Sequence, residues 1–263
     1  MTQDHDPELL IETARFVEDT PLPDFHSRRA VAGIEEEAGA FPNFDAPELA
    51  VTVGSQIASF SGGIDGEVKE AISNAFLFAQ QVADKQIETN PQATSTDWYA
   101  IYVDVMSRIG WIREEGTHTL RKLSGAQASV HDEIIPIVTA ALGPAGASAT
   151  IIQVLDGLKN MDAGSPWITL FNRTSQRASA NQFQVAHVDE VDGTPRIKLI
   201  GFELNAERAV NQVLFFKFST DRADLRHFET KMSVDQPIFS EVAPIVKSRL
   251  AERARDFILA IDL

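Results

Sequence analysis

Residues 192–204, DGTPRIKLIGFEL, decide the fold class of this chain. Asp192 and Gly193 form a two-residue hairpin signal, because both residue types tolerate the positive φ angles of a tight turn. The residues that follow, 196–204, predict a strand with Ile197 and Leu199 on the same side. A connection this short allows antiparallel neighbours and leaves no room for a parallel crossover. The stretch therefore predicts an antiparallel sheet.

Several neighbouring segments extend this hairpin into a meander. Residues 167–171 (WITLF) are rich in β-forming side chains, and residues 183–188 predict the strand that precedes the turn. Residues 210–219 (VNQVLFFKFS) and 225–232 (LRHFETKM) predict two more strands. Together they predict an antiparallel β-meander of about four to five strands over residues 166–233.

Apolar residues at spacings of three and four predict helices on both sides of the meander. The segments are 67–88, 97–113, 131–158 and 237–261, with Pro244 inside the last as a point of kinking or late start. An N-terminal helical half, a meander and a C-terminal helix predict the α+β class, packed as one layered domain. Within residues 51–263 we expect helices over 67–160, the meander over 166–233 and the final helix over 237–261.

Residues 1–50 differ from the rest in charge. They hold 12 acidic and 3 basic residues, a net charge of −9 out of −15 for the whole chain. Four prolines, Pro21, Pro23, Pro42 and Pro47, interrupt this segment after residue 20. We therefore expect an acidic, partly irregular N-terminal arm over residues 1–50, lying on the single α+β domain of residues 51–263.

The composition excludes several classes of function. A net charge of −15 repels phosphate backbones, so we expect no nucleic-acid partner. The chain has no cysteine, which excludes disulfides, thiolate metal sites and cysteine nucleophiles. The N-terminus MTQDHDPELL is not a standard secretory signal peptide. We expect synthesis in the cytoplasm, with any export following a non-classical route.

Residues 134–155 (IIPIVTAALGPAGASATIIQVL) form a run of 22 residues without a charge. Pro136 and the Gly143-Pro144 pair divide it into halves that are too short to span a bilayer as one helix. The run predicts either a helical hairpin buried in a soluble core or a hairpin that is released at a membrane. The candidate lipid-contacting residues are Ile134, Ile135, Ile137, Val138, Leu142, Ile151, Ile152, Val154 and Leu155, together with the aromatic residues Trp98, Tyr102 and Trp111.

A second candidate site lies between an apolar stretch and the helix predicted over residues 67–88. Ser61, Gly62, Gly63 and Asp65 resemble the SGGxD[ST] loop of the ATP pyrophosphatase family, whose backbone amides hold a pyrophosphate at a helix start. This chain has Gly66 where the family has Ser or Thr. The resemblance implies a nucleotide-binding enzyme, and an ordinary glycine-containing turn is the alternative.

Other catalytic or metal-binding patterns are missing from the sequence. The six histidines form no HxxxH, HxH or HExxH spacing, and the chain contains no GxSxG or Walker loop. We therefore predict no metal, no cofactor and no catalytic residue, although a dispersed active site would leave no local pattern.

The organisation of the chain resembles small bacterial virulence factors and cytolytic toxins, in which helical layers surround an antiparallel sheet. The residues that carry the resemblance are FLFAQQVADKQ and TDWYAIYVDVMSRIGWI within 76–112, and VNQVLFFKFS followed by VDQPIFSEVAPIVKSRL. It implies a non-enzymatic protein that interacts with a membrane or lipid. A soluble module that binds a protein or a small apolar ligand is the other alternative, and a homo-oligomer is left open.

Overall fold

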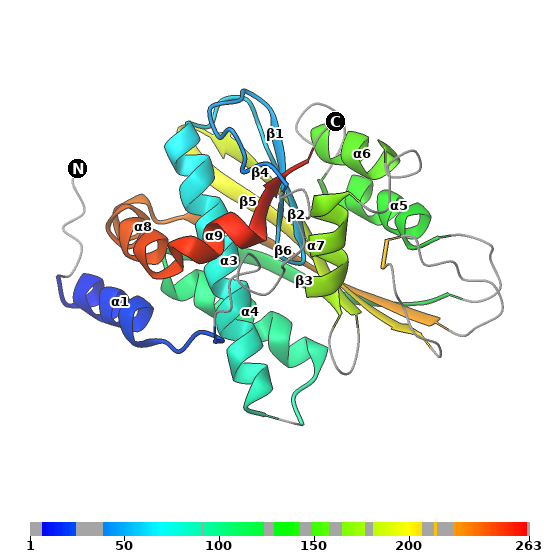
Figure 1. Cartoon of the computed structure of the whole chain (residues 1–263), viewed down its shortest axis with the longest axis horizontal. Helices are drawn as coiled ribbons and strands as arrows, with labels where there is room; N and C mark the ends of the chain where they lie inside the picture. Colours follow the sequence, from blue (N-terminus) through cyan, green and yellow to red (C-terminus); the bar gives the residue numbers. More distant parts are fainter. Residues whose placement is uncertain are drawn as a thin grey trace, which may run out of the picture.

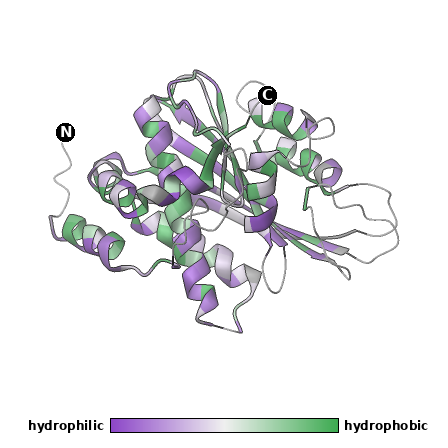
Figure 2. Ribbon diagram, viewed as in Figure 1, coloured by the Kyte–Doolittle hydropathy of each residue, from purple (hydrophilic) through white to green (hydrophobic). Residues whose placement is uncertain are grey.

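A computed structural model shows a mixed β-sheet with helices on both faces (Figure 1). The structure describes residues 7–24, 39–90, 92–123, 129–142, 149–157, 165–176, 181–206, 213–214 and 223–261. The layering confirms the α+β class predicted from the hairpin and its flanking helices. Figure 2 shows hydrophobic residues in the strands and in the helices on either side of them.

Within the described residues the sheet has seven strands in the order β3-β6-β5-β4-β2-β1-β7. Their bounds are β1 Leu49–Val53, β2 Gln56–Phe60, β3 Trp111–Leu123, β4 Asn181–Val191, β5 Thr194–Ala206, β6 Ala223–Val234 and β7 Ile258–Ala260. Neighbouring strands are antiparallel except β2 and β4, which are parallel. The sheet is therefore larger than the meander and includes a parallel pair between strands distant in sequence.

The turn between β4 and β5 confirms the hairpin expected at Asp192 and Gly193. Their φ angles are 52° and 75°, and Val191 pairs with Thr194 across the turn. Positive φ at both central residues defines the turn whose twist matches that of two antiparallel strands. This local chemistry sets the register of the central β4–β5–β6 ladder.

The first helical layer consists of α3 (Gly66–Glu88), α4 (Ser95–Arg108) and α8 (Gln236–Leu250). Helix α3 matches the helix predicted over residues 67–88, and its middle turns are buried on all sides. A capping box at Thr94 and Asp97 starts α4, because each side chain accepts a hydrogen bond from the other residue's backbone N–H. The apolar cluster of this face contains Phe76, Leu77 and Tyr102.

The opposite face carries α5 (Val130–Leu142), α6 (Ala149–Gly157) and α7 (Pro166–Ser175). These shorter helices pack on a second apolar cluster that includes Ile57, Val185 and Ile200 of the sheet. The uncharged run of residues 134–155 thus falls in two helices, as predicted, and residues 143–148 between them lie outside the described part of the chain.

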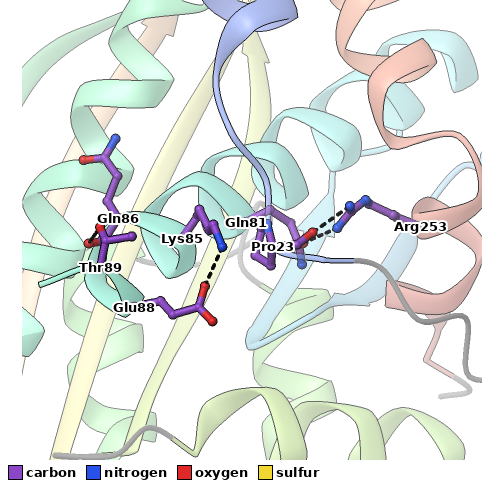
Figure 3. A network of polar contacts seen from close by, with 7 residues as sticks. All are labelled: Pro23, Gln81, Lys85, Gln86, Glu88, Thr89 and Arg253. Atoms are coloured by element: carbon purple, nitrogen blue, oxygen red, sulfur yellow. Dashed lines mark hydrogen bonds and ion pairs between the residues drawn. The ribbon is translucent and has the colours of Figure 1, made fainter. Parts of the chain in front are cut away.

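Helix α1 (Pro7–Asp19) and the segment after it lie against α8 and the C-terminal helix α9 (Glu252–Phe257). Arg249 donates hydrogen bonds to the carbonyls of Val17 and Thr20. Arg253 donates to the Pro23 carbonyl at 2.7 Å and to the Gln81 side chain at 3.0 Å (Figure 3). Two arginines therefore hold the described part of the N-terminal arm on the domain.

The prediction of a strand over residues 167–171 is wrong. This segment lies in α7, which begins with Pro166 after Ser165, a favourable position for proline. Trp167, Leu170 and Phe171 recur at helical spacing and are buried against the sheet, so packing overrides their β-propensity.

Helix ends also differ from the predictions in two places. The helix predicted over 97–113 ends at Arg108, and Trp111 instead begins β3 after Gly110, whose φ is +98°. The helix predicted over 237–261 ends at Leu250, where Ala251 has a φ of 33°, and α9 and β7 follow. The strand predicted over 210–219 lies outside the described residues except Val213 and Leu214, which form a buried turn.

Candidate functional site: the α5–α6 helical pair

The apolar residues predicted to contact lipid gather on the inner faces of α5 and α6. The buried members are Ile134, Ile137, Val138, Leu142, Ile151, Val154 and Leu155. Ile135 and Ile152 are partly buried and pack against the same cluster. Helix α5 tolerates Pro136 within its second turn, and Ser129 donates a hydrogen bond to Asp132 at the start of the helix. The structure therefore brings all nine aliphatic candidates together.

Aliphatic contacts form most of the surface between this pair and the sheet. Helix α5 faces β5, and α6 faces β1 and β2. Such contacts are strong but not directional, because hydrophobic burial depends on area rather than orientation. An alternative apolar environment can replace them without leaving a hydrogen bond unmade.

Among the described residues, Lys198 and Thr150 make polar contacts between the pair and the rest of the protein, near its outer edges. The Lys198 ammonium donates to the Leu142 carbonyl at 3.1 Å, at the C-terminal end of α5. The Thr150 hydroxyl donates to Glu48 at 3.4 Å, close to the limit of a hydrogen bond. The side chain of Lys198 is 29% exposed, so water competes for its contact. Both contacts contribute little beside the aliphatic packing.

A buried polar row lies on the sheet face that carries α5, α6 and α7. Ser59 on β2, His187 on β4 and Lys198 on β5 occupy one register row across three strands. Alternation along the strands puts them on the face of Ile57 and Val185. The Ser59 hydroxyl and His187 Nδ1 are 2.9 Å apart, and both residues are buried.

His187 is held in its neutral form by this environment. Burial lowers its pKa from 6.5 to about 4, Asp189 opposes the shift, and Lys198 adds to it. Its Nε2 atom is buried and has no hydrogen-bond partner among the residues that the structure describes. No sequence pattern indicates a role for His187, because a histidine in a β-strand carries no spacing signal. Only the register between strands places it beside Ser59.

The three aromatic candidates lie on the other face of the sheet. Trp98 and Tyr102 stack on α4 with ring centroids 5.5 Å apart, and Tyr102 donates to the Gln56 side chain at 2.9 Å. Trp111 on β3 packs edge-on against Phe239 of α8. All three are buried. The structure therefore does not bring them to the α5–α6 pair.

The SGGxD-like loop connects β2 to α3, as a phosphate-binding loop would. Ser61, Gly62, Gly63 and Asp65 form this connection, and Asp65 stands at the N-cap without a side-chain cap bond. The Asp45 carboxylate approaches Gly66 at the first turn of α3. Lys69 is buried and donates to the carbonyls of Ala46 and Pro47. Protein groups thus surround the helix start, and the nucleotide site stays a prediction.

The described residues set two further limits on function. No described helix is both long enough and apolar enough to cross a membrane. In the same residues, no group of three or more His, Asp or Glu side chains is placed to hold a metal ion.

Comparisons with solved structures give distant structural neighbours. No family model and no curated protein matches the chain. A solved structure titled delta-endotoxin is similar with a TM-score of 0.44 and 11% identity, covering 85% of this chain and 96% of that chain. The Evf virulence factor structure has a TM-score of 0.32 and 11% identity, covering 95% of this chain and 92% of that chain. Neither likeness is high enough to assign a family.

Proposed function

We propose that this chain is a non-enzymatic, membrane- or lipid-interacting protein of the toxin or virulence-factor type. The α5–α6 pair leaves the sheet and inserts into lipid, which then surrounds its inner aliphatic face as well as its outer side. The observation that carries the proposal is how this pair is attached to the sheet. Its uncharged run, residues 134–155, buries an aliphatic face, and Thr150 and Lys198 make the described polar contacts at its edges. Lipid replaces aliphatic packing at little cost, because both environments are apolar.

Acid favours this release in two ways. Protonation of carboxylates lowers the net charge of −15 and its repulsion from anionic lipid. Protonation of His187 is also unfavourable while the residue is buried, because its pKa is lowered to about 4. Opening the helical pair lets water reach the imidazole and removes this penalty.

The test uses one exposed position on α5 and a matched position on α8. Ala140 and Ser240 are both exposed, and they lie on opposite faces of the sheet. Since the chain lacks cysteine, Ala140→Cys and Ser240→Cys each accept a single environment-sensitive dye. With liposomes at about pH 5 we expect a blue shift from the dye at position 140 and none at position 240.

Aspartate at the same two positions tests the consequence for function. Ala140→Asp adds a charge that water solvates in the closed fold, whereas a charge inside a bilayer costs about 3 kcal/mol. We expect Ala140→Asp to reduce dye release from liposomes at least about tenfold, and Ser240→Asp to leave it unchanged. Absence of both liposome binding and dye release in the wild type, at neutral and acid pH, would end the proposal.

A further inference from the structure

Among the described strands, β3 forms one end of the sheet and has a long edge with no paired strand. It spans 13 residues, Trp111–Leu123, and pairs with β6 along its length. Within the described part of the chain no strand pairs with its other edge. The side chains of Arg113, Glu115 and Thr117 on this strand are exposed. A strand edge of this length is a template for pairing with another chain.

The regular part of this edge begins after a bulge. The β3–β6 register shifts between Arg113 and Glu115, which leaves Glu114 as the extra residue. From Glu115 to Leu123 the pairing is continuous over nine residues. The other end of the sheet differs, because β7 has three residues and its Ala260 amide already donates to the Ala40 carbonyl. The pairing surface is therefore the regular segment 115–123 of β3.

The sequence of this segment is complementary to itself in the antiparallel direction. In a pair with a two-fold axis normal to the sheet, opposed residues share a face, so one residue lies on the axis. With His118 on the axis, Glu115 lies opposite Arg121 of the second copy, twice by symmetry, and Thr117 lies opposite Thr119. An axis at Thr117 places Glu115 opposite Thr119, and an axis at Thr119 places it opposite Leu123. Either shift loses both charge pairs.

We propose that a second copy of this chain pairs antiparallel with the edge of β3, centred on His118. Within one copy Glu115 already accepts from Lys231 of β6 at 2.7 Å. Pairing adds Arg121 of the second copy to this row. The row then crosses three strands: Lys231 on β6 and Glu115 on β3 of one copy, and Arg121 on β3 of the other. Backbone hydrogen bonds supply the attachment and the charge pairs select the register. The two sheets become continuous, and the proposal does not depend on membrane binding.

Charge reversal tests the register. The single variants Glu115→Arg and Arg121→Glu each put like charges opposite one another at two symmetric places. We expect each to raise the dimer dissociation constant at least about tenfold in sedimentation equilibrium of the full chain. An equimolar mixture of the two variants has opposite charges at both places, as does the double variant, and we expect both to recover the wild-type constant to within about threefold.

Matched controls separate register from total charge. Glu241→Arg and Arg255→Glu make the same charge changes at exposed positions outside β3, and we expect them to keep the wild-type dissociation constant. Circular dichroism of each single variant checks that it remains folded. A wild type that stays monomeric up to the highest soluble concentration overturns the proposal. It is also overturned if the single reversals dimerise as the wild type does, or if folded single variants do not associate when mixed.

Discussion

The two faces of the sheet are covered by helices that are attached in different ways. On the α3–α4–α8 face, buried polar side chains tie the helices to strands: Gln80 bonds both Ser55 and the Val53 carbonyl. Tyr102 bonds Gln56 on the same face. On the α5–α6 face, aliphatic side chains of both helices pack on the sheet, and the buried Ser59–His187 contact joins two strands rather than a helix to a strand. The described polar contacts of α5 and α6 with the rest of the protein lie at the edges.

This difference separates the exclusion of water from the fixing of one geometry, two properties that burial alone does not distinguish. Both interfaces exclude water, but buried hydrogen bonds also fix one geometry, since separating the groups leaves donors and acceptors unsatisfied. An aliphatic interface loses only the benefit of its buried area and can recover that benefit in another apolar environment. We therefore expect the α3–α4–α8 face to keep one geometry, as a fixed frame, and the α5–α6 pair to be able to leave the sheet, as a moving cover.

The largest expected effect on stability comes from a leucine-to-alanine substitution made once on each face. Leu77 on α3 and Leu155 on α6 are both fully buried. Leu77→Ala should lower the global free energy of unfolding by about 3 kcal/mol, because it leaves a cavity in the fixed frame. Leu155→Ala should lower mainly the opening free energy of amides in α5 and α6. Chemical denaturation and native-state hydrogen exchange measure the two quantities. Equal loss of protection in α3 from both variants would show that the faces unfold as one unit.

The second effect is a dependence of the free energy of unfolding on pH, caused by His187 on the sheet face that the moving cover occupies. His187 has a pKa of about 4 when folded and about 6.5 when solvated, so its neutral form stabilises the closed state above pH 6.5. As the pH falls from 6.5 to 4 this contribution is lost, up to about 3 kcal/mol at 1.36 kcal/mol per pKa unit. Denaturation midpoints of the wild type should fall more steeply over this range than those of His187→Gln. Parallel pH profiles would exclude His187 as the group responsible.

The smallest effect compares one polar contact from each face. Tyr102→Phe leaves the buried Gln56 side chain without its donor and should cost about 1.5 kcal/mol. Thr150→Val removes a 3.4 Å contact to exposed Glu48 and should cost less than about 0.5 kcal/mol. Thermal or chemical unfolding of the two variants is sufficient to rank them. If Thr150→Val lowers the free energy of unfolding more than Tyr102→Phe does, polar contacts rather than aliphatic packing hold the moving cover on the sheet.

The sequence predictions are correct for features that depend on neighbouring residues and fail for features that depend on residues far apart in the chain. Helix α3 and the turn at Asp192 and Gly193 depend on neighbouring residues, and the structure confirms both. Residues 134–155 fall in two helices, as the Gly143-Pro144 pair predicts, whereas the predicted break at Pro136 is wrong because Pro136 lies inside α5. Residues 167–171 were assigned incorrectly, because their β-branched and aromatic side chains also match a helix once the sheet buries one side.

The candidate site could be predicted only in part for the same reason. The nine aliphatic residues of α5 and α6 were found from the absence of charge, which is a local signal. Ser59 and His187 were missed, because they are far apart in the chain and meet only through the parallel pairing of β2 with β4. No spacing within either strand indicates that contact.

The sequence by itself determined the helical periods, the tight turn, the acidic balance and the uncharged run. Each depends on the chemistry of residues within a few positions of one another. The tertiary structure decided that a charged segment such as β3 becomes a strand, that α7 is a helix, and that His187 is buried beside Ser59. The physical reason is that hydrogen-bond partners and buried area across distant segments exist only once the sheet has formed, and there they outweigh local preference.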